Sequence, residues 1–209
     1  WTVCVLFFQT VLLIAYAYAW LLSRVSNPLN WRIFHGFVCF LSLGMLPLFF
    51  KPALGESLPE LCILKNLFLQ LGLPLLVIGS SAPLLQSVFS RTRNLRARDP
   101  YFLYAASNMG SLLALFSYPW IIERFWGISN QFFAWNIIYL IYLGFLFVLL
   151  YRTKNDSMVS NHKKYLAIAW KTKAIWIILS FIPCSLMLGV TFYISTDVAA
   201  TPIFWVFPL

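Results

Sequence analysis

Residues 1–23 read WTVCVLFFQTVLLIAYAYAWLLS, an apolar run that contains no charged side chain. A helix of about 20 such residues is long enough to cross the hydrocarbon core of a bilayer. A helix also satisfies its own backbone hydrogen bonds, which a segment surrounded by lipid cannot satisfy with water. This run therefore predicts a transmembrane α-helix.

The same kind of apolar run recurs along the chain. Of the 209 residues, 61% are hydrophobic and 10% are charged, whereas a soluble domain keeps roughly 25% charged residues. A soluble core of this size could not cover so much apolar surface, so lipid is the expected partner. We predict an all-α integral membrane protein with about six transmembrane helices and the start of a seventh near Pro202. The other five predicted helices are residues 31–50, 67–89, 101–122, 131–151 and 174–194.

The helix predicted at 67–89 has two alternative starting points. Residues 57–60 read SLPE, the pattern of a helix-capping box, which would start this helix early and outside the membrane. Gly72 and Pro74 predict a kink inside it, because proline lacks a backbone N–H and crowds the preceding turn.

Positive charge alternates between successive loops. Loops 24–32, 90–100 and 152–173 carry two, four and six Lys or Arg, twelve of the fifteen in the chain. Loops 51–66 and 123–130 carry the other three. Because cytoplasmic loops are enriched in Lys and Arg, the first three loops are predicted to face the cytoplasm. The net charge of +9 thus reflects topology, and no nucleic-acid partner is expected.

This topology places Trp1 on the outer side with no signal peptide, so at least one further helix is expected before it. The loop 152–173 would then follow an original sixth helix, where major-facilitator transporters have their central loop. We therefore divide the chain into a five-helix bundle at 1–151, a basic cytoplasmic loop at 152–173, and the sixth helix with the start of the next half at 174–209. Residues 162–173 suit either an interfacial helix or a plain linker.

Polar side chains inside the predicted helices are the candidates for a solute site, since polar groups in lipid need a partner, water or a ligand. On the fourth helix they share one face at helical spacing. Packing between helices is the favoured explanation of the same residues, and Asn108 is predicted to be buried against the first or third helix. The candidate solute-binding residues are Gln9, Tyr16, Gln86, Ser107, Asn108, Ser111 and Asp197.

Asp197 follows the sixth helix and precedes an apolar restart. It could cap a short helix at 198–200, or it could contact a cation or substrate. The four cysteines and two histidines form no metal-binding pattern, and no nucleophile–base pair is recognisable. We therefore expect no catalytic residue, metal or cofactor in this segment.

Three stretches of the chain resemble one family. They resemble the membrane region of bacterial fused proteins that join a major-facilitator-like or spermidine-synthase-associated helical domain to a spermidine-synthase-like Rossmann domain. A preceding helix, later helices and the soluble domain of that family have no counterpart here. The stretches are WTVCVLFFQ (1–9) with YAYA (16–19), GLP (72–74) with SAPLLQ (81–86) and DPYFLYAASNMGS (99–111), and TDVAA (196–200) with WVFPL (205–209).

The resemblance implies a multi-pass protein of the bacterial cytoplasmic (inner) membrane. It suggests a transporter-like domain that handles or presents a small solute, with the polyamine chemistry assigned to a synthase domain outside this segment. The alternative is a non-catalytic anchor or accessory subunit that packs against a partner membrane complex. Its partners would be lipid and either other membrane subunits or the remainder of its own chain.

Overall fold

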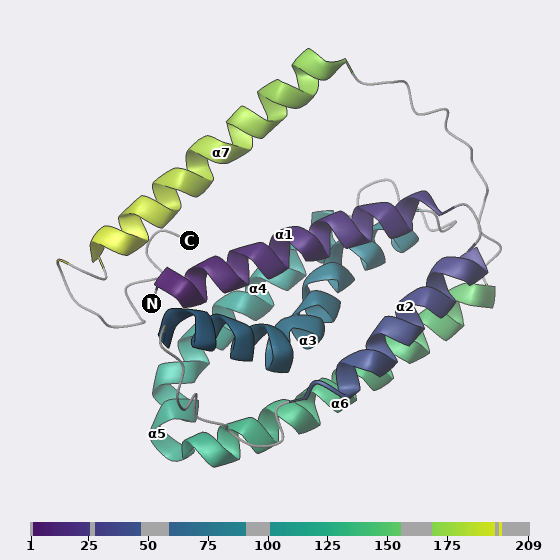
Figure 1. Ribbon diagram of the computed structural model, residues 1–209. Coiled ribbons are helices and arrows are strands. Elements are labelled where there is room, and N and C mark those ends of the chain that lie inside the picture. Colours follow the sequence, from purple (N-terminus) through teal and green to yellow (C-terminus); the bar gives the residue numbers. More distant parts are fainter. Residues whose placement is uncertain are drawn as a thin grey trace. The chain divides into compact units, whose positions relative to one another are not determined.

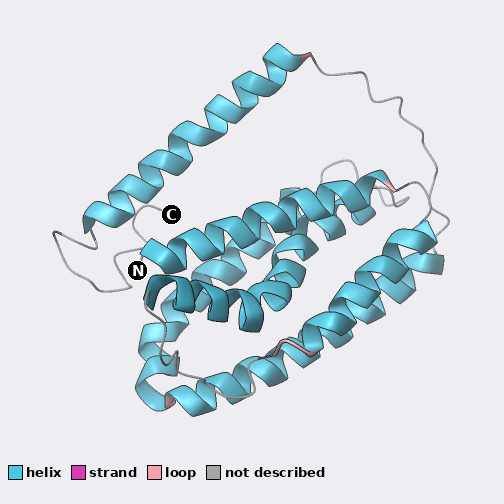
Figure 2. Cartoon of the chain, viewed as in Figure 1, coloured by secondary structure: helices cyan, strands magenta, loops and turns pink. Residues whose placement is uncertain are grey.

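The computed structural model describes residues 2–25, 28–46, 59–90, 101–155 and 169–194, together with Asp197. Its ordered elements in these ranges are all helical, which confirms the predicted all-α class (Figure 2). In chain order (Figure 1) they are α1 (Thr2–Arg24), α2 (Pro28–Leu43), α3 (Pro59–Phe89), α4 (Tyr101–Ser117), the π-helical turn η2 (Tyr118–Ile122), α5 (Glu123–Phe125), α6 (Ile128–Asn155) and α7 (Trp170–Tyr193).

Within the described ranges, four helices are long and apolar enough to cross a membrane. The other two predicted spans correspond to α2 and α4, which have 16 and 17 residues. A helix needs about 20 residues to span the hydrocarbon core. Because α4 runs on directly into η2 and α5, its helical path is longer than α4 alone. A total of six spans stays a prediction. The four candidate spans are Val3–Arg24, Glu60–Phe89, Ile128–Leu150 and Trp170–Tyr193.

Helix α3 begins at Pro59, which confirms the earlier of its two predicted starts. Ser57, the predicted capping residue, lies outside the described residues. Both Pro74 and Pro83 lie inside the helix, and its ribbon does not run straight in Figure 1. The early start makes α3 31 residues long, so it extends well beyond the thickness of the hydrocarbon core.

The basic loop predicted at 152–173 is shorter in the structure than in the sequence prediction. Helix α6 continues to Asn155 and α7 already begins at Trp170, so both ends of the predicted loop are helical. Apolar periodicity stops where Lys and Arg begin, but a helix can continue through such residues because they have good helix propensity. The predicted interfacial helix lies outside the described residues apart from its last turn.

The chain divides into two compact units. The first unit comprises Trp1–Ala105 and Gly127–Val159, and the second comprises Ala106–Trp126 and Ser160–Leu209. The first unit therefore holds α1, α2, α3, α6 and the beginning of α4. The second unit holds the rest of α4 with η2, α5 and α7.

Helix α1 packs against α3 through one stripe of its surface. The buried residues of this stripe recur every three or four positions, so they share one helical face. Small side chains bring the two helices close together: a Cβ added at Gly79 of α3 would lie 3.1 Å from the Cβ of Ala15. The stripe consists of Phe7, Val11, Ala15, Ala19 and Leu22.

Helix α2 contacts both α3 and α6, and two apolar clusters mark these contacts. Each cluster draws its members from at least three helices, which is what holds the first unit together. The cluster that joins α1, α2 and α3 contains Ala19, Leu22, Trp31, Leu84 and Val88. The cluster that joins α2, α3 and α6 contains Cys39, Val77, Tyr139, Leu143 and Leu146.

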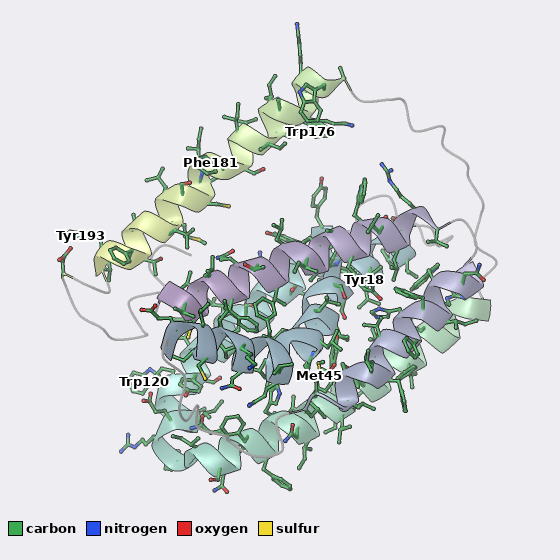
Figure 3. The ribbon with its side chains drawn as sticks, viewed as in Figure 1. Tyr18, Met45, Trp120, Trp176, Phe181 and Tyr193 are labelled. Carbon is green, nitrogen blue, oxygen red and sulfur yellow. The ribbon has the colours of Figure 1, made fainter. Side chains whose placement is uncertain are left out.

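The second unit is built differently. Neither α4 nor α7 has a buried residue, although both are strongly apolar. Trp176 and Phe181 stand out from α7 with more than half of their surface exposed (Figure 3). Apolar side chains on every face of a helix are typical of a segment that lipid or another membrane helix covers.

Candidate functional site

The polar side chains that gather in the first unit lie on the faces where its helices meet. On α2, Trp31, His35, Cys39 and Ser42 are all buried and follow one another at intervals of three or four residues. They therefore lie on one face of the helix. Neighbouring helices contribute tyrosines and serines to the same interior.

The first polar contact joins α1 to α2. Tyr18 extends from α1 toward α2 (Figure 3), and its hydroxyl is hydrogen-bonded to Nδ1 of His35 at 2.9 Å. The two rings also lie against each other, with centroids 5.9 Å apart. His35 is 1% exposed and Tyr18 is half-buried, so this contact lies largely inside the bundle. A polar pair buried this deeply specifies how α1 and α2 approach each other.

The second polar contact joins α6 to α2. The hydroxyl of Ser42 donates to the carbonyl oxygen of Cys39 at 2.6 Å and lies 2.6 Å from the hydroxyl of Tyr139. A serine hydroxyl has one proton, and Ser42 gives it to the backbone. Tyr139 must therefore be the donor to Ser42. The result is a chain of two hydrogen bonds that runs from an α6 phenol to an α2 carbonyl.

The third polar contact repeats this arrangement between α6 and α3. Ser81 donates to the carbonyl oxygen of Val77 at 2.7 Å and is also hydrogen-bonded to the hydroxyl of Tyr142. By the same proton count, Tyr142 is the donor to Ser81. Ser80 also donates to the Val77 carbonyl, at 3.1 Å. One turn of α6 thus holds two other helices through tyrosine–serine pairs.

Two side chains of α2 contain buried nitrogen atoms whose hydrogen-bonding capacity is not used within the described part of the chain. Nε and Nη2 of Arg32 and Nε2 of His35 have no hydrogen-bond partner among the described residues. The two residues are three positions apart, so their side chains start from neighbouring points on the helix surface. Since buried polar atoms are nearly always satisfied, these nitrogens are candidates for contact with a group that the described residues do not supply.

The predicted solute-binding residues do not meet one another in the described structure. Gln9, Tyr16 and Gln86 belong to the first unit, where Gln9 and Tyr16 are exposed and Gln86 is half-buried. The other four belong to the second unit and are all exposed. The side chain of Ser111 makes a local contact within α4, donating to the carbonyl oxygen of Ser107 at 3.2 Å.

Two predictions about these residues can be compared with the structure. Asn108 is exposed rather than buried, so the predicted burial against the first or third helix is not seen. The face that carries Asn108 belongs to α4, which has no buried residue at all. Asp197 is exposed, and the short helix that it was predicted to cap lies outside the described residues.

The residues that the structure does gather were mostly overlooked by sequence reasoning. Tyr18, His35, Ser42, Tyr139 and Tyr142 each look unremarkable in an apolar run. A hint was available on α2, where the polar residues recur at helical spacing. This spacing indicates a polar contact only once the neighbouring helices are known to supply hydrogen-bond partners for these residues.

Over the described residues, no group of three or more His, Cys, Asp or Glu side chains could hold a metal ion. Comparisons of the chain with protein-family models, with curated proteins and with solved structures find no match.

Proposed function

We propose that this chain is a multi-pass domain of the bacterial inner membrane, of the transporter-like kind associated with spermidine-synthase-like proteins, and that it handles or presents a small solute. The observation that supports this proposal is the polar interior of the first unit. Buried imidazole and hydroxyl groups are costly among apolar helices, so each of them needs a partner in the bundle or a ligand. In this proposal the chain itself contributes no catalytic group.

The chemistry of that interior suggests how a solute would be held. Its tyrosine and serine hydroxyls are neutral, and Trp135, Tyr139 and Tyr142 lie close together on α6, with successive ring centroids 6.3 and 6.0 Å apart. Glu60 is the one acid among the described residues of the first unit, and it is exposed. An amine solute would therefore be held by hydrogen bonds and aromatic faces rather than by a carboxylate.

The orientation in this proposal follows the charge of the loops. Loops 24–32, 90–100 and 152–173 face the cytoplasm, as their share of Lys and Arg indicates. Single cysteines introduced at Asn94 and at Ser57, in a background without native cysteines, test it. Labelling of Asn94→Cys by an impermeant reagent added outside intact cells would reverse the orientation.

A flux assay tests the proposed function. The full chain is reconstituted in vesicles, and uptake of radiolabelled spermidine and of a neutral polar solute is measured. Tyr139→Phe and His35→Gln should each lower uptake at least about tenfold, the effect of removing interactions worth about 1.4 kcal/mol in the transport barrier. Tyr104→Phe is the matched control, because Tyr104 is 57% exposed and forms none of these contacts. Equal uptake by all variants, or none by the unaltered protein with any amine or neutral probe, would refute solute handling.

A second candidate function is supported by the second unit. Because α7 carries apolar side chains on all faces and buries none, a non-catalytic anchor that packs against a partner membrane complex is also consistent with the chain. Gentle solubilisation followed by native pull-down distinguishes the two functions. A stoichiometric membrane partner supports the anchor, whereas recovery of the chain alone argues against it.

A further inference from the structure

The edge of Arg32 that is buried without a partner is the edge best suited to an oxyanion. Nε and Nη2 are adjacent, and their N–H groups point in parallel from one side of the planar guanidinium. Both of these atoms are buried and have no hydrogen-bond partner among the described residues. The ring of Trp31 lies 5.5 Å from Cζ of Arg32. Two parallel donors of this kind bind phosphate or carboxylate in a bidentate manner.

His35 offers a third donor close by. Its Nδ1 is engaged with the Tyr18 hydroxyl, and its Nε2 is buried without a partner in the described part of the chain. When the Tyr18 phenol donates to Nδ1, the imidazole proton resides on Nε2, which then becomes a donor. Arg32 and His35 are three residues apart on α2, one helical turn. Three N–H groups can thus converge on one anion.

We infer that Arg32 and His35 bind the phosphate group of a phospholipid at the cytoplasmic end of α2. The phosphate chemistry follows from the paired donors of the guanidinium, and the lipid source follows from their surroundings. Next to Arg32 on α2, Ile33 is 62% exposed and Phe34 is 53% exposed, so apolar chains can lie beside the site. The loop 24–32 carries the basic residues that indicate the cytoplasmic interface, where lipid phosphates reside. This inference does not depend on whether the domain moves a solute.

Arg24 provides a matched comparison at the same end of the helices. Its guanidinium lies 3.9 Å from the centroid of the Trp20 ring, and the side chain is exposed. Removing Arg24 therefore removes one positive charge near the interface without touching a buried pair of donors. A site made by general positive charge would treat Arg24 and Arg32 alike, but a bidentate site would not.

The test measures how three probes raise the unfolding midpoint of the purified full chain in a non-ionic detergent. The probes are dioctanoyl phosphatidylglycerol, inorganic phosphate, and dioctanoylglycerol, which has the acyl chains without the phosphate. A ligand that binds the folded state raises the midpoint in proportion to its affinity. Phosphatidylglycerol should raise it, and dioctanoylglycerol should not.

Four single variants test whether phosphatidylglycerol binds at Arg32 and His35. Arg32→Gln should weaken phosphatidylglycerol binding at least about tenfold, and Arg32→Lys nearly as much, because lysine keeps the charge but loses the paired donors. His35→Ala should weaken it several-fold, while Arg24→Gln should stay within about twofold. Size-exclusion profiles establish which variants are folded. If Arg32→Gln does not fold, the comparison is made with Arg32→Lys.

Four outcomes would overturn the inference. Equal losses for Arg24→Gln and Arg32→Gln would show a diffuse charge effect, and stabilisation by dioctanoylglycerol would show a purely apolar one. Inorganic phosphate that binds as well as the lipid in an Arg32-dependent manner would refute the lipid source. If Asp99→Asn lowers the midpoint as much as Arg32→Gln without any probe, and the double variant lowers it no further, Arg32 pairs with a carboxylate of its own chain instead.

Discussion

Helices α1 and α7 differ in what surrounds them, although both are apolar and long enough to cross a membrane. On α1, Phe7 and Ala15 are fully buried against the rest of the first unit, whereas α7 has no buried residue. Two glycines show the same difference. A Cβ added at Gly79 of α3, which faces α1, would meet Ala15, whereas a Cβ added at Gly189 of α7 would meet nothing within 4 Å. The two helices share an apolar composition, but α1 is also closely packed where its Ala15 faces Gly79 of α3.

The largest expected effect comes from filling the close approach between α1 and α3. Gly79→Leu would push a side chain against Ala15 and Leu12, because a Cβ alone would lie 3.1 Å from Ala15 and 3.6 Å from Leu12. Overpacking of this kind costs about 1–3 kcal/mol or more in the free energy of unfolding. Unfolding in mixed micelles with increasing SDS measures it. Gly189→Leu is the control and should change stability by less than about 0.5 kcal/mol. Equal effects of the two changes would mean that α1 and α3 do not pack as described.

A smaller loss of stability is expected when a large side chain is removed from the same interface. Phe7 is fully buried, and its ring meets Phe68 edge-on with centroids 4.9 Å apart. In lipid the transfer term is small, because the unfolded helix is also in an apolar medium. A residual cavity of roughly 80 Å³ at about 24 cal/mol per Å³ still costs about 2 kcal/mol in Phe7→Ala. Phe181→Ala on α7, measured in the same SDS titration, should cost under about 0.5 kcal/mol. A loss as large for Phe181 as for Phe7 would show that α7 is packed against another helix.

The tyrosine–serine pairs should contribute less to the free energy of unfolding than the apolar interface between α1 and α3. Tyr139→Phe removes the donor to Ser42 but keeps the ring, so the expected loss is about 1 kcal/mol or less. Ser42→Ala alone and the double variant complete a cycle, and a coupling free energy of about 0.5–1 kcal/mol would establish the pair. Tyr104→Phe should leave stability unchanged, since its side chain is exposed. Fully additive effects of Tyr139→Phe and Ser42→Ala would contradict the hydrogen bond.

The smallest effect is expected at Asn108, on a helix with no buried residue. Asn108→Leu should change the free energy of unfolding by less than about 0.5 kcal/mol, because the amide is exposed. Chemical unfolding in mixed micelles checks it. A loss of about 1–2 kcal/mol, the size of a good interhelical hydrogen bond, would instead establish that α4 is packed against a neighbour as the sequence predicted.

The helices themselves were largely predictable. The first was predicted at 1–23 and is observed at Thr2–Arg24, and the last was predicted at 174–194 and is observed at Trp170–Tyr193. Such runs are predictable because length and apolarity are properties of consecutive residues. The ends were less predictable, as α6 continues to Asn155 among polar residues. Helix propensity carries a helix past the point where apolarity stops.

The candidate site was predictable to a much smaller extent. Gln9 and Asn108 stand out in the sequence as polar residues within apolar runs, yet both are exposed. Tyr18 and Tyr142 are not among the predicted site residues, yet they form the part-buried contacts with His35 and Ser81. In a helix that is apolar all round, the sequence contains no amphipathic pattern to indicate which face is covered. The sequence shows that a residue is polar, but it does not show whether that residue lies on the buried or the exposed face of the helix.

The sequence by itself determined that this protein is a chain of apolar helices whose basic loops alternate along it, because both features depend only on neighbouring residues. Tertiary structure alone decided which polar groups meet. Tyr139 finds Ser42 across 97 positions of sequence, and Tyr18 finds His35 across 17. Pairings between helices depend on which faces turn toward each other, and small residues such as Gly79 set that approach through their contacts with another helix. The buried donors of Arg32 became a binding site to test only after those faces were known.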